Sequence, residues 1–257
     1  MSGILHARND LKRRWTGLVG PVLDLLYPPF CSLCRCPLRG NRWLCDDCAG
    51  RLPRIAEPFC QRCGEPYAGV IEDTFTCPNC SELKFAFDFA RPALRNHPET
   101  RALILDLKYR RHLHLAGELG RLALESLEDP RFRPALENHW PVVPVPIHWK
   151  RLGKRHFNQA EEIARVFAKI AGLPVVSALK RTRDTGTQTR LDRRKRLQNL
   201  RGAFALSRSG RRLLREPIPG AIVLDDVFTT GATTHECART LRKAGVQSVV
   251  VVAVMRG

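Results

Sequence analysis

The sequence contains none of the short motifs that mark the commonest catalytic sites. A Walker A loop, the G-x-G-x-x-G turn of dinucleotide-binding folds, the H-E-x-x-H helix of zinc peptidases and the G-x-S-x-G turn of α/β hydrolases are all absent. These absences exclude the enzyme classes that such motifs define. Any chemistry must come from a different arrangement of polar residues.

The chain also lacks a hydrophobic run long enough to cross a bilayer. A membrane-spanning helix needs about 20 mostly apolar residues, whereas the apolar stretch from Gly17 to Phe30 is short and is interrupted by Pro21 and Asp24. No secretory signal pattern is present. We therefore expect residues 1–29 to form an amphipathic helix and the protein to be cytoplasmic, with no membrane span. Packing on its own protein is the favoured role for such a helix, and lying on a membrane surface is the alternative.

Acidic residues are scarce in one long segment. The formal net charge of the chain is +18, and the segment from Lys150 to Arg215 has nineteen Lys and Arg residues against four Asp and Glu residues, a net charge of +15. A field of this sign attracts polyanions such as nucleotides, pyrophosphate compounds or nucleic acid. An Arg-rich solvated surface without a ligand is the alternative.

Eight of the ten cysteines lie in four C-x2-C pairs. Two residues between cysteines let both thiolates face one metal, and four thiolates complete a tetrahedral zinc site. We predict a double zinc ribbon over residues 30–82 with two structural Zn²⁺ ions and sequential pairing; interleaved pairing and a single occupied site stay open. The predicted ligands are Cys31, Cys34, Cys45 and Cys48 for one ion and Cys60, Cys63, Cys77 and Cys80 for the other.

The segment from Ala221 to Ala244 carries the clearest chemical pattern. Its apolar start predicts a buried parallel strand. Asp225 and Asp226 then end the apolar run, and two adjacent carboxylates are costly to bury unless something pairs with them. A hydroxyl-rich loop follows, and the T-x-x-E spacing of Thr233 and Glu236 predicts a capping box where a helix starts. A helix N-terminus suits a phosphate, because its free N–H groups and its dipole both favour negative charge.

The stretch LDDVFTTGATT closely resembles the PRPP-binding motif of type I phosphoribosyltransferases. Together with the Cys-rich N-terminus and the segment RHFNQAEEIA, it makes the chain resemble the ComF/GntX family of phosphoribosyltransferase-like proteins, which is linked to competence and DNA uptake. The resemblance implies an α/β fold over residues 83–257, a parallel sheet flanked by helices, behind a small double zinc ribbon with four cysteines at each metal site.

The resemblance also assigns roles around PRPP, which binds such sites with Mg²⁺. It makes Asp225 and Asp226 the catalytic pair, which holds the ribose hydroxyls and stabilises positive charge at the anomeric carbon. The other expected site residues are Thr229, Thr230, Gly231, Ala232 and Thr233 for the 5′-phosphate, Lys150, Arg151, Arg155, Asn158 and Gln159 for the pyrophosphate, and Arg181, Arg183 and Gln188 in a flexible loop that closes over PRPP.

Some positions match the family less simply. Lys108 begins a segment that matches the family pattern K-[YF]-x-G near the active site, but Arg111 stands where the family usually has Gly. His156 likewise replaces a family Gly. Asn158 fits a plain helix N-cap with Glu161 at the third helical position, which is the alternative to a ligand role.

Two functions from different classes follow. The first is an enzyme that transfers the phosphoribosyl group from PRPP to an acceptor that the sequence does not name. The alternative is a non-catalytic accessory protein of DNA uptake that binds single-stranded DNA or a nucleotide and works with DNA-uptake proteins. The basic segment and the zinc ribbons favour the second function, whereas the intact acid pair and hydroxyl loop favour the first. The sequence predicts no oligomeric state.

Overall fold

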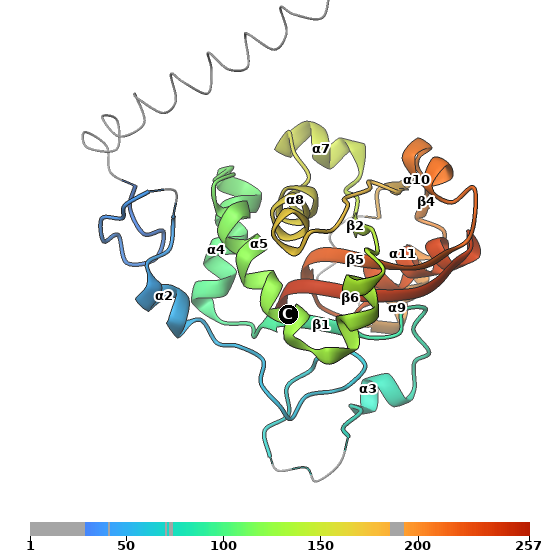
Figure 1. Cartoon of the computed structure of the whole chain (residues 1–257), viewed down its shortest axis with the longest axis horizontal. Coiled ribbons are helices and arrows are strands. Elements are labelled where there is room, and N and C mark those ends of the chain that lie inside the picture. Colours follow the sequence, from blue (N-terminus) through green and yellow to red (C-terminus); the bar gives the residue numbers. More distant parts are fainter. Residues whose placement is uncertain (1–28, 41, 70, 72–73, 186–192) are drawn as a thin grey trace, which may run out of the picture. The chain divides into compact units, whose positions relative to one another are not determined.

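The computed structural model describes residues 29–40, 42–69, 71, 74–185 and 193–257 (Figure 1). The chain forms two compact units, Met1–Arg51 and Leu52–Gly257, so the second group of four cysteines shares a unit with the sheet. The helix expected over residues 1–29 lies outside the described residues except at its last position. Among the residues that are described, no helix is long and apolar enough to cross a bilayer.

The larger unit is built on a four-stranded parallel sheet in the order β1-β6-β5-β2. Its strands are β1 (Ala90–Leu94), β2 (Val142–Pro144), β5 (Ile218–Phe228) and β6 (Val246–Arg256). The two central strands, β5 and β6, are almost continuously apolar and buried, as expected of parallel strands covered on both faces. The parallel sheet confirms the predicted fold class.

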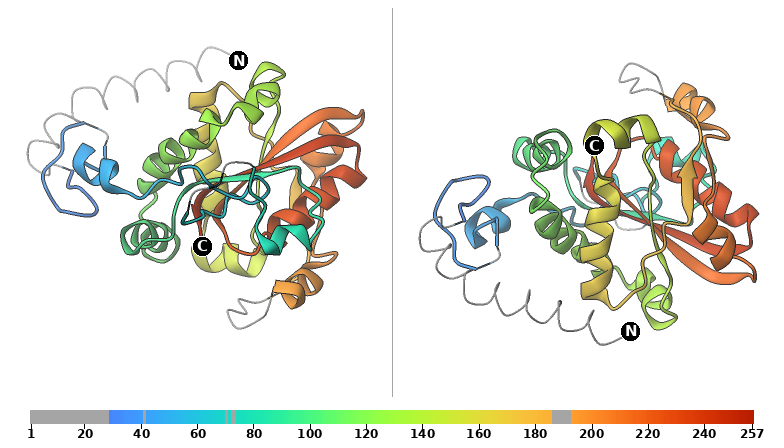
Figure 2. Two further views of the ribbon diagram at one scale, coloured as in Figure 1. Left: turned by 90° about the horizontal axis from the view of Figure 1, so that it is seen from below. Right: turned by 90° about the horizontal axis from the view of Figure 1, so that it is seen from above.

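Helices cover both faces of this sheet (Figure 2). On one face α5 (Leu115–Leu124) packs against α8 (Gln159–Ala171), and α4 (Pro98–Arg110) lies beside α5. On the other face α11 (Ala232–Lys243) contacts β5, β6 and α9 (Arg193–Leu200). The apolar stripe of α8 explains its packing, since Ile163 and Phe167 are fully buried, whereas Ile170 near the helix end is 52% exposed.

Short elements complete the larger unit. A two-stranded antiparallel sheet pairs β3 with β4 and contacts α11 through β4. The remaining elements of both units are α2 (Asp46–Arg51), α3 (Pro78–Ser81), η1 (Glu125–Glu128), η2 (Pro130–Phe132), α6 (Arg133–Glu137), α7 (Trp149–Arg155), β3 (Leu179–Arg181), β4 (Phe204–Leu206) and α10 (Arg208–Leu213).

Arg111 and His156 are two of the four described non-glycine residues with positive φ, beside Arg35 and His139. Arg111 follows α4 with φ 60°, and His156 follows α7 with φ 67°. These are the two positions where the related family usually has Gly. The turns are therefore kept, at the steric cost that a Cβ brings in this region.

The sequence pattern misjudged where strand β5 ends. We expected Asp225 and Asp226 to follow the strand, but β5 continues through both to Phe228. The reason is that β6 extends equally far and pairs with β5 as far as Phe228 opposite Arg256. The acid pair is consequently part of the sheet, which fixes its backbone.

The first knuckle of each ribbon has the same backbone hydrogen bonds. The N–H of Cys31 donates to Cys36 O, and the N–H of Cys60 donates to Glu65 O, both at 2.8 Å. The residue after each C-x2-C pair has a positive φ, 65° at Arg35 and 67° at Gly64. Cys36 and Glu65 therefore occupy equivalent positions in the two ribbons.

Candidate functional site

The acid pair on β5 is held by a lysine from a distant helix. Asp226 is only 4% exposed, and its carboxylate forms an ion pair with Lys108 near the end of α4. The Asp225 carboxylate accepts a hydrogen bond of 2.9 Å from the backbone N–H of Asp226. Lys108, which the family pattern had marked, is thus the direct partner of the candidate site.

The two carboxyl groups differ in proton affinity. Burial raises the pKa of Asp225 well above its ordinary value, and the neighbouring charge of Asp226 raises it further. Burial alone would also raise the pKa of Asp226, but Lys108, with a smaller contribution from Arg155, outweighs it and lowers that pKa. The site therefore keeps one carboxylate charged and disfavours the charge on the other.

A tight glycine turn follows β5 and starts α11. Gly231 has φ 75°, and a Cβ there would lie 2.8 Å from the Phe228 ring and 3.1 Å from the Phe85 ring. No larger residue fits without moving these rings. The first turn of α11 begins with Ala232 and Thr233. The first N–H groups of a helix have no acceptor within the helix, so they can donate hydrogen bonds to an anion. The five predicted phosphate residues therefore lie at one helix N-terminus.

The predicted capping box is wrong. The helix begins at Ala232 with Gly231 at the N-cap, so Thr233 lies inside the first turn. The Glu236 carboxylate instead accepts a hydrogen bond of 2.5 Å from the N–H of Gly202 and pairs with Arg239. The T-x-x-E spacing is a local pattern, but the Glu236 carboxylate accepts its hydrogen bond from a residue distant in the sequence.

Arginines from two elements surround the acid pair. Arg155 on α7 lowers the pKa of Asp226 by its charge. Arg181 on β3 is largely buried; burial and the nearby charge of Arg151 lower its pKa, and Asp225 opposes this shift. The charges of Arg155 and Arg181 therefore act on the acid pair, whereas Arg151 acts on Arg181 and forms an ion pair of 3.9 Å with Asp184. Lys150, the first cation of α7, is exposed.

Asn158 and Gln159 link this region to the sheet. The Asn158 amide donates a hydrogen bond of 3.0 Å to Val145 O, just after β2, and the Gln159 side chain accepts one of 3.1 Å from Arg155. Asn158 stands at the N-cap of α8, but its side chain makes no capping hydrogen bond. The plain N-cap alternative is therefore not realised.

Arg183, the second predicted arginine of the loop, contacts α9 instead of the acid pair. The Arg183 side chain donates to the backbone oxygens of Asn199 and Arg201 and so holds the end of α9. Gln188 lies outside the described residues. Their roles toward PRPP stay predictions.

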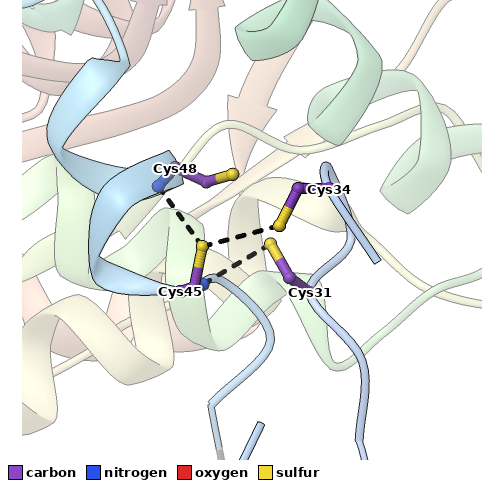
Figure 3. Close-up of side chains that lie close together, drawn as sticks. All are labelled: Cys31, Cys34, Cys45 and Cys48. Carbon is purple, nitrogen blue, oxygen red and sulfur yellow. Dashed lines mark hydrogen bonds between the residues drawn. The ribbon is translucent and has the colours of Figure 1, made fainter. Parts of the chain in front are cut away.

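The eight paired cysteines form two clusters in sequence order. In each cluster the four sulfur atoms lie within 4.8 Å of one another. Figure 3 shows the first cluster, in which the Cys34 and Cys45 sulfurs are 3.7 Å apart. Four sulfur donors at this spacing are the ligand set that tetrahedral Zn²⁺ prefers. The two clusters fit two structural zinc ions, paired sequentially as predicted.

These features define a class of protein: a double zinc ribbon joined to an α/β domain whose acid pair precedes a glycine turn and a helix N-terminus. Known proteins similar to this chain support the same class. A family model described as "Double zinc ribbon domain" matches residues 22–81. The chain is 31% identical to the "DNA utilization protein YhgH" of Salmonella typhimurium over 88% of this chain and 96% of that protein. It is 27% identical to the "Competence protein F" of Haemophilus influenzae over 86% and 94%.

The chain belongs to the ComF/GntX family, as the cysteine pattern and the acid-pair motif indicated. Among solved structures, the orotate phosphoribosyltransferase of Aeropyrum pernix matches with 18% identity over 61% of this chain and 76% of that chain, at a TM-score of 0.32. A likeness this low carries no argument about the site.

Sequence reasoning missed one residue that shapes the loop. Arg256, at the end of β6, is 9% exposed and donates hydrogen bonds to the backbone oxygens of Phe228 and Thr229. Nothing local marks it, because it acts on a segment far earlier in the chain.

We expect the purified protein to carry two zinc ions per chain. Cys34→Ser and Cys63→Ser should each lower the content to one, because three thiolates hold zinc far more weakly than four. Atomic absorption on gel-filtered protein measures this. Cys237→Ser is the matched control, since Cys237 belongs to neither cluster. Retention of both ions in Cys63→Ser would contradict the assignment.

Lys108→Met should destabilise the protein by about 3–5 kcal/mol, because it leaves the Asp226 charge buried without its counterion. Adding Asp226→Asn should recover most of the loss. Urea unfolding measures both variants, and Lys169→Met, at an exposed lysine on α8, is the matched control. A loss in Lys108→Met no larger than in the control would show that the ion pair is unimportant.

The pH dependence of stability should separate the two carboxyl groups. The lowered pKa of Asp226 contributes stability above the unfolded Asp value of about 3.9, and this is lost as pH falls through the folded pKa. The raised pKa of Asp225 acts oppositely, so stability decreases as pH rises toward it. Asp225→Asn should therefore unfold at higher urea than the parent at pH 7. Equal or lower stability would contradict the assignment.

Proposed function

We propose that the carboxyl end of β5 binds PRPP, or a related nucleotide, and that phosphoribosyl transfer is the reaction this site supports. One observation carries the proposal: two adjacent carboxylates, Asp225 and Asp226, are held in a central strand directly before a glycine turn and a helix N-terminus. Carboxylates accept hydrogen bonds from ribose hydroxyls, and the free N–H groups of a helix N-terminus donate hydrogen bonds to a phosphate. One sugar phosphate matches both.

Each group has a distinct task in this proposal. The loop of Thr229–Thr233 seats the 5′-phosphate by its amide and hydroxyl groups. Asp226 stays charged beside Lys108, so it stabilises positive charge that develops at the anomeric carbon. Arg155 and Arg181, whose charges act on the acid pair, and Arg151, whose charge acts on Arg181, supply the positive charge that a leaving pyrophosphate needs.

Magnesium enters the proposal with PRPP. Mg²⁺ is usually bound by one or two carboxylates together with substrate phosphates, and keeps several waters. Asp225 is the fitting donor, because Asp226 already pairs with Lys108. Bound Mg²⁺ would neutralise charge on the pyrophosphate, and its charge would favour the ionised form of Asp225.

Isothermal titration with PRPP and Mg²⁺ tests the proposal. The parent should bind with a Kd of about 1–100 µM, or about −8 to −5.5 kcal/mol. Asp225→Asn/Asp226→Asn should lose the binding. The matched control is Asp46→Asn/Asp47→Asn, an adjacent acid pair on α2 that is exposed, so the same charge change is made elsewhere. A folded parent that does not bind PRPP, or a control that loses binding equally, would overturn it.

A second candidate function is single-stranded DNA binding. Trp149 is 68% exposed and Tyr109 is 64% exposed, and each ring has a cation beside it, Lys150 at 5.7 Å and Arg155 at 5.0 Å. Bases stack on exposed aromatic rings, and neighbouring cations attract the backbone. The relatives named for DNA utilisation and competence favour the same function.

Fluorescence anisotropy with labelled single-stranded DNA tests this second function. Trp149→Ala and Tyr109→Ala should each weaken binding by about 1–3 kcal/mol, the usual worth of one stacked base. Binding should fall as salt rises and should survive Asp225→Asn/Asp226→Asn. Ile170→Ala removes an exposed apolar side chain from α8 as the control. No binding at low salt would remove this function.

A further inference from the structure

The guanidinium of Arg256 holds the start of the loop that follows β5. Its Nη1 donates to the backbone oxygens of Phe228 at 3.0 Å and Thr229 at 2.6 Å, and also to that of Gly257 at 2.6 Å. The side chain is only 10% exposed and lies over the Phe228 ring. Because Thr229 is the first residue of the loop, the position of Arg256 sets the direction in which the loop leaves the sheet.

The other end of the same guanidinium contacts the second zinc ribbon. Nη2 of Arg256 forms an ion pair with the carboxylate of Glu65, which follows the knuckle pair of Cys60 and Cys63. The backbone of Glu65 is fixed by that knuckle, since its carbonyl accepts the N–H of Cys60 at 2.8 Å. Gly64 before it fits tightly against Pro92 of β1. These contacts fix the backbone from which the Glu65 side chain reaches Arg256.

Aromatic packing joins the same two parts a second time. The chain leaves the second cluster at Cys80 and then places the stacked rings of Phe85 and Phe87, 4.6 Å apart, against the loop. The Phe87 ring meets the Phe228 ring edge-on at 5.9 Å, and Phe85 is a ring that leaves little room for a Cβ at Gly231.

A hydrogen bond extends this contact into α11. The N–H of Ala86 donates to Nδ1 of His235 at 3.0 Å. Burial lowers the pKa of His235, which keeps this nitrogen free to accept. The sulfurs of the second cluster and both phenylalanine rings belong to one buried core with Phe228 and Ala232. The loop is thus supported by an ion pair from the second ribbon and by the aromatic rings of the segment that follows this ribbon.

We infer that Glu65 and Arg256 are positioning residues for the loop at Thr229–Gly231, and that the second zinc ribbon acts as the support that keeps this loop ready for a phosphate. The inference rests on the proposed function for its ligand. The link between the second ribbon and the loop, through Glu65 and Arg256, rests on the contacts above. The first ribbon is the internal comparison, because it has Cys36 at the position of Glu65 and offers no carboxylate there.

Hydrogen exchange of the zinc-loaded full chain tests the link without any ligand. Glu65→Gln keeps the size of the side chain and removes its charge, so the amides from Phe228 to Ala232 should exchange about three- to tenfold faster through local opening. Glu65→Asp, which keeps the charge, should restore part of the protection. Glu57→Gln is the matched control, an exposed glutamate in the chain just before the same ribbon. Zinc content and the urea midpoint report whether the fold is intact.

PRPP titration of the same variants separates the two ideas. Glu65→Gln should weaken PRPP binding about three- to tenfold with zinc content unchanged, whereas Glu57→Gln and Cys34→Ser should bind like the parent. Faster exchange in Glu65→Gln with no PRPP binding even by the parent would keep the link and reject the proposed function. PRPP binding by the parent with parent-like exchange and affinity in Glu65→Gln would keep the function and overturn the link.

Discussion

The ion pair between Lys108 and Asp226 is the interaction on which the candidate site depends. The sheet holds two adjacent carboxyl groups, Asp226 buried and Asp225 partly buried, because β5 continues through both and pairs with β6. Two carboxylate charges there would repel each other strongly, because the protein interior has a low dielectric constant. Lys108 neutralises one, and burial disfavours the charge on the other. A protein cation therefore balances the charge of the acid pair, and in the proposed function a ligand with hydroxyl groups and its own cation would use both carboxylates.

The loop beside this pair is supported from outside the sheet. Glycine at position 231 is required by the rings of Phe228 and Phe85, and Arg256 holds the backbone just before it. Both contacts connect the loop to the second zinc ribbon: Arg256 pairs with Glu65, and the rings after Cys80 pack in one core with the second cysteine cluster. A ribbon of this size has little apolar core of its own, so its rigidity comes from the metal. If the loop binds a phosphate as proposed, packing and one ion pair would couple zinc binding to phosphate binding, without a shared ligand.

The features that could be predicted from the sequence are those with local signatures. C-x2-C spacing specifies a metal ligand set, and both clusters formed as expected. The apolar run before Asp225 and the loop after it predicted the order of strand, turn and helix, although β5 continues to Phe228 and α11 begins at Ala232. Features that depend on distant partners could not be predicted. Glu236 has the spacing of a capping box, yet Gly202 supplies its hydrogen-bond donor. Phe85 and Phe87 alternate like a strand, yet the strand β1 begins at Ala90, because these rings pack around the loop. Arg256 has no local signature at all.

The decisive experiment is a crystal structure of the protein with PRPP and Mg²⁺. We expect the 5′-phosphate on the amides of Thr230–Thr233, the ribose hydroxyls on Asp225 and Asp226, and the pyrophosphate toward Arg151 and Arg155. Lys108 should stay beside Asp226. PRPP bound elsewhere, or a well-ordered structure at millimolar PRPP with nothing at the end of β5, would contradict the proposed function.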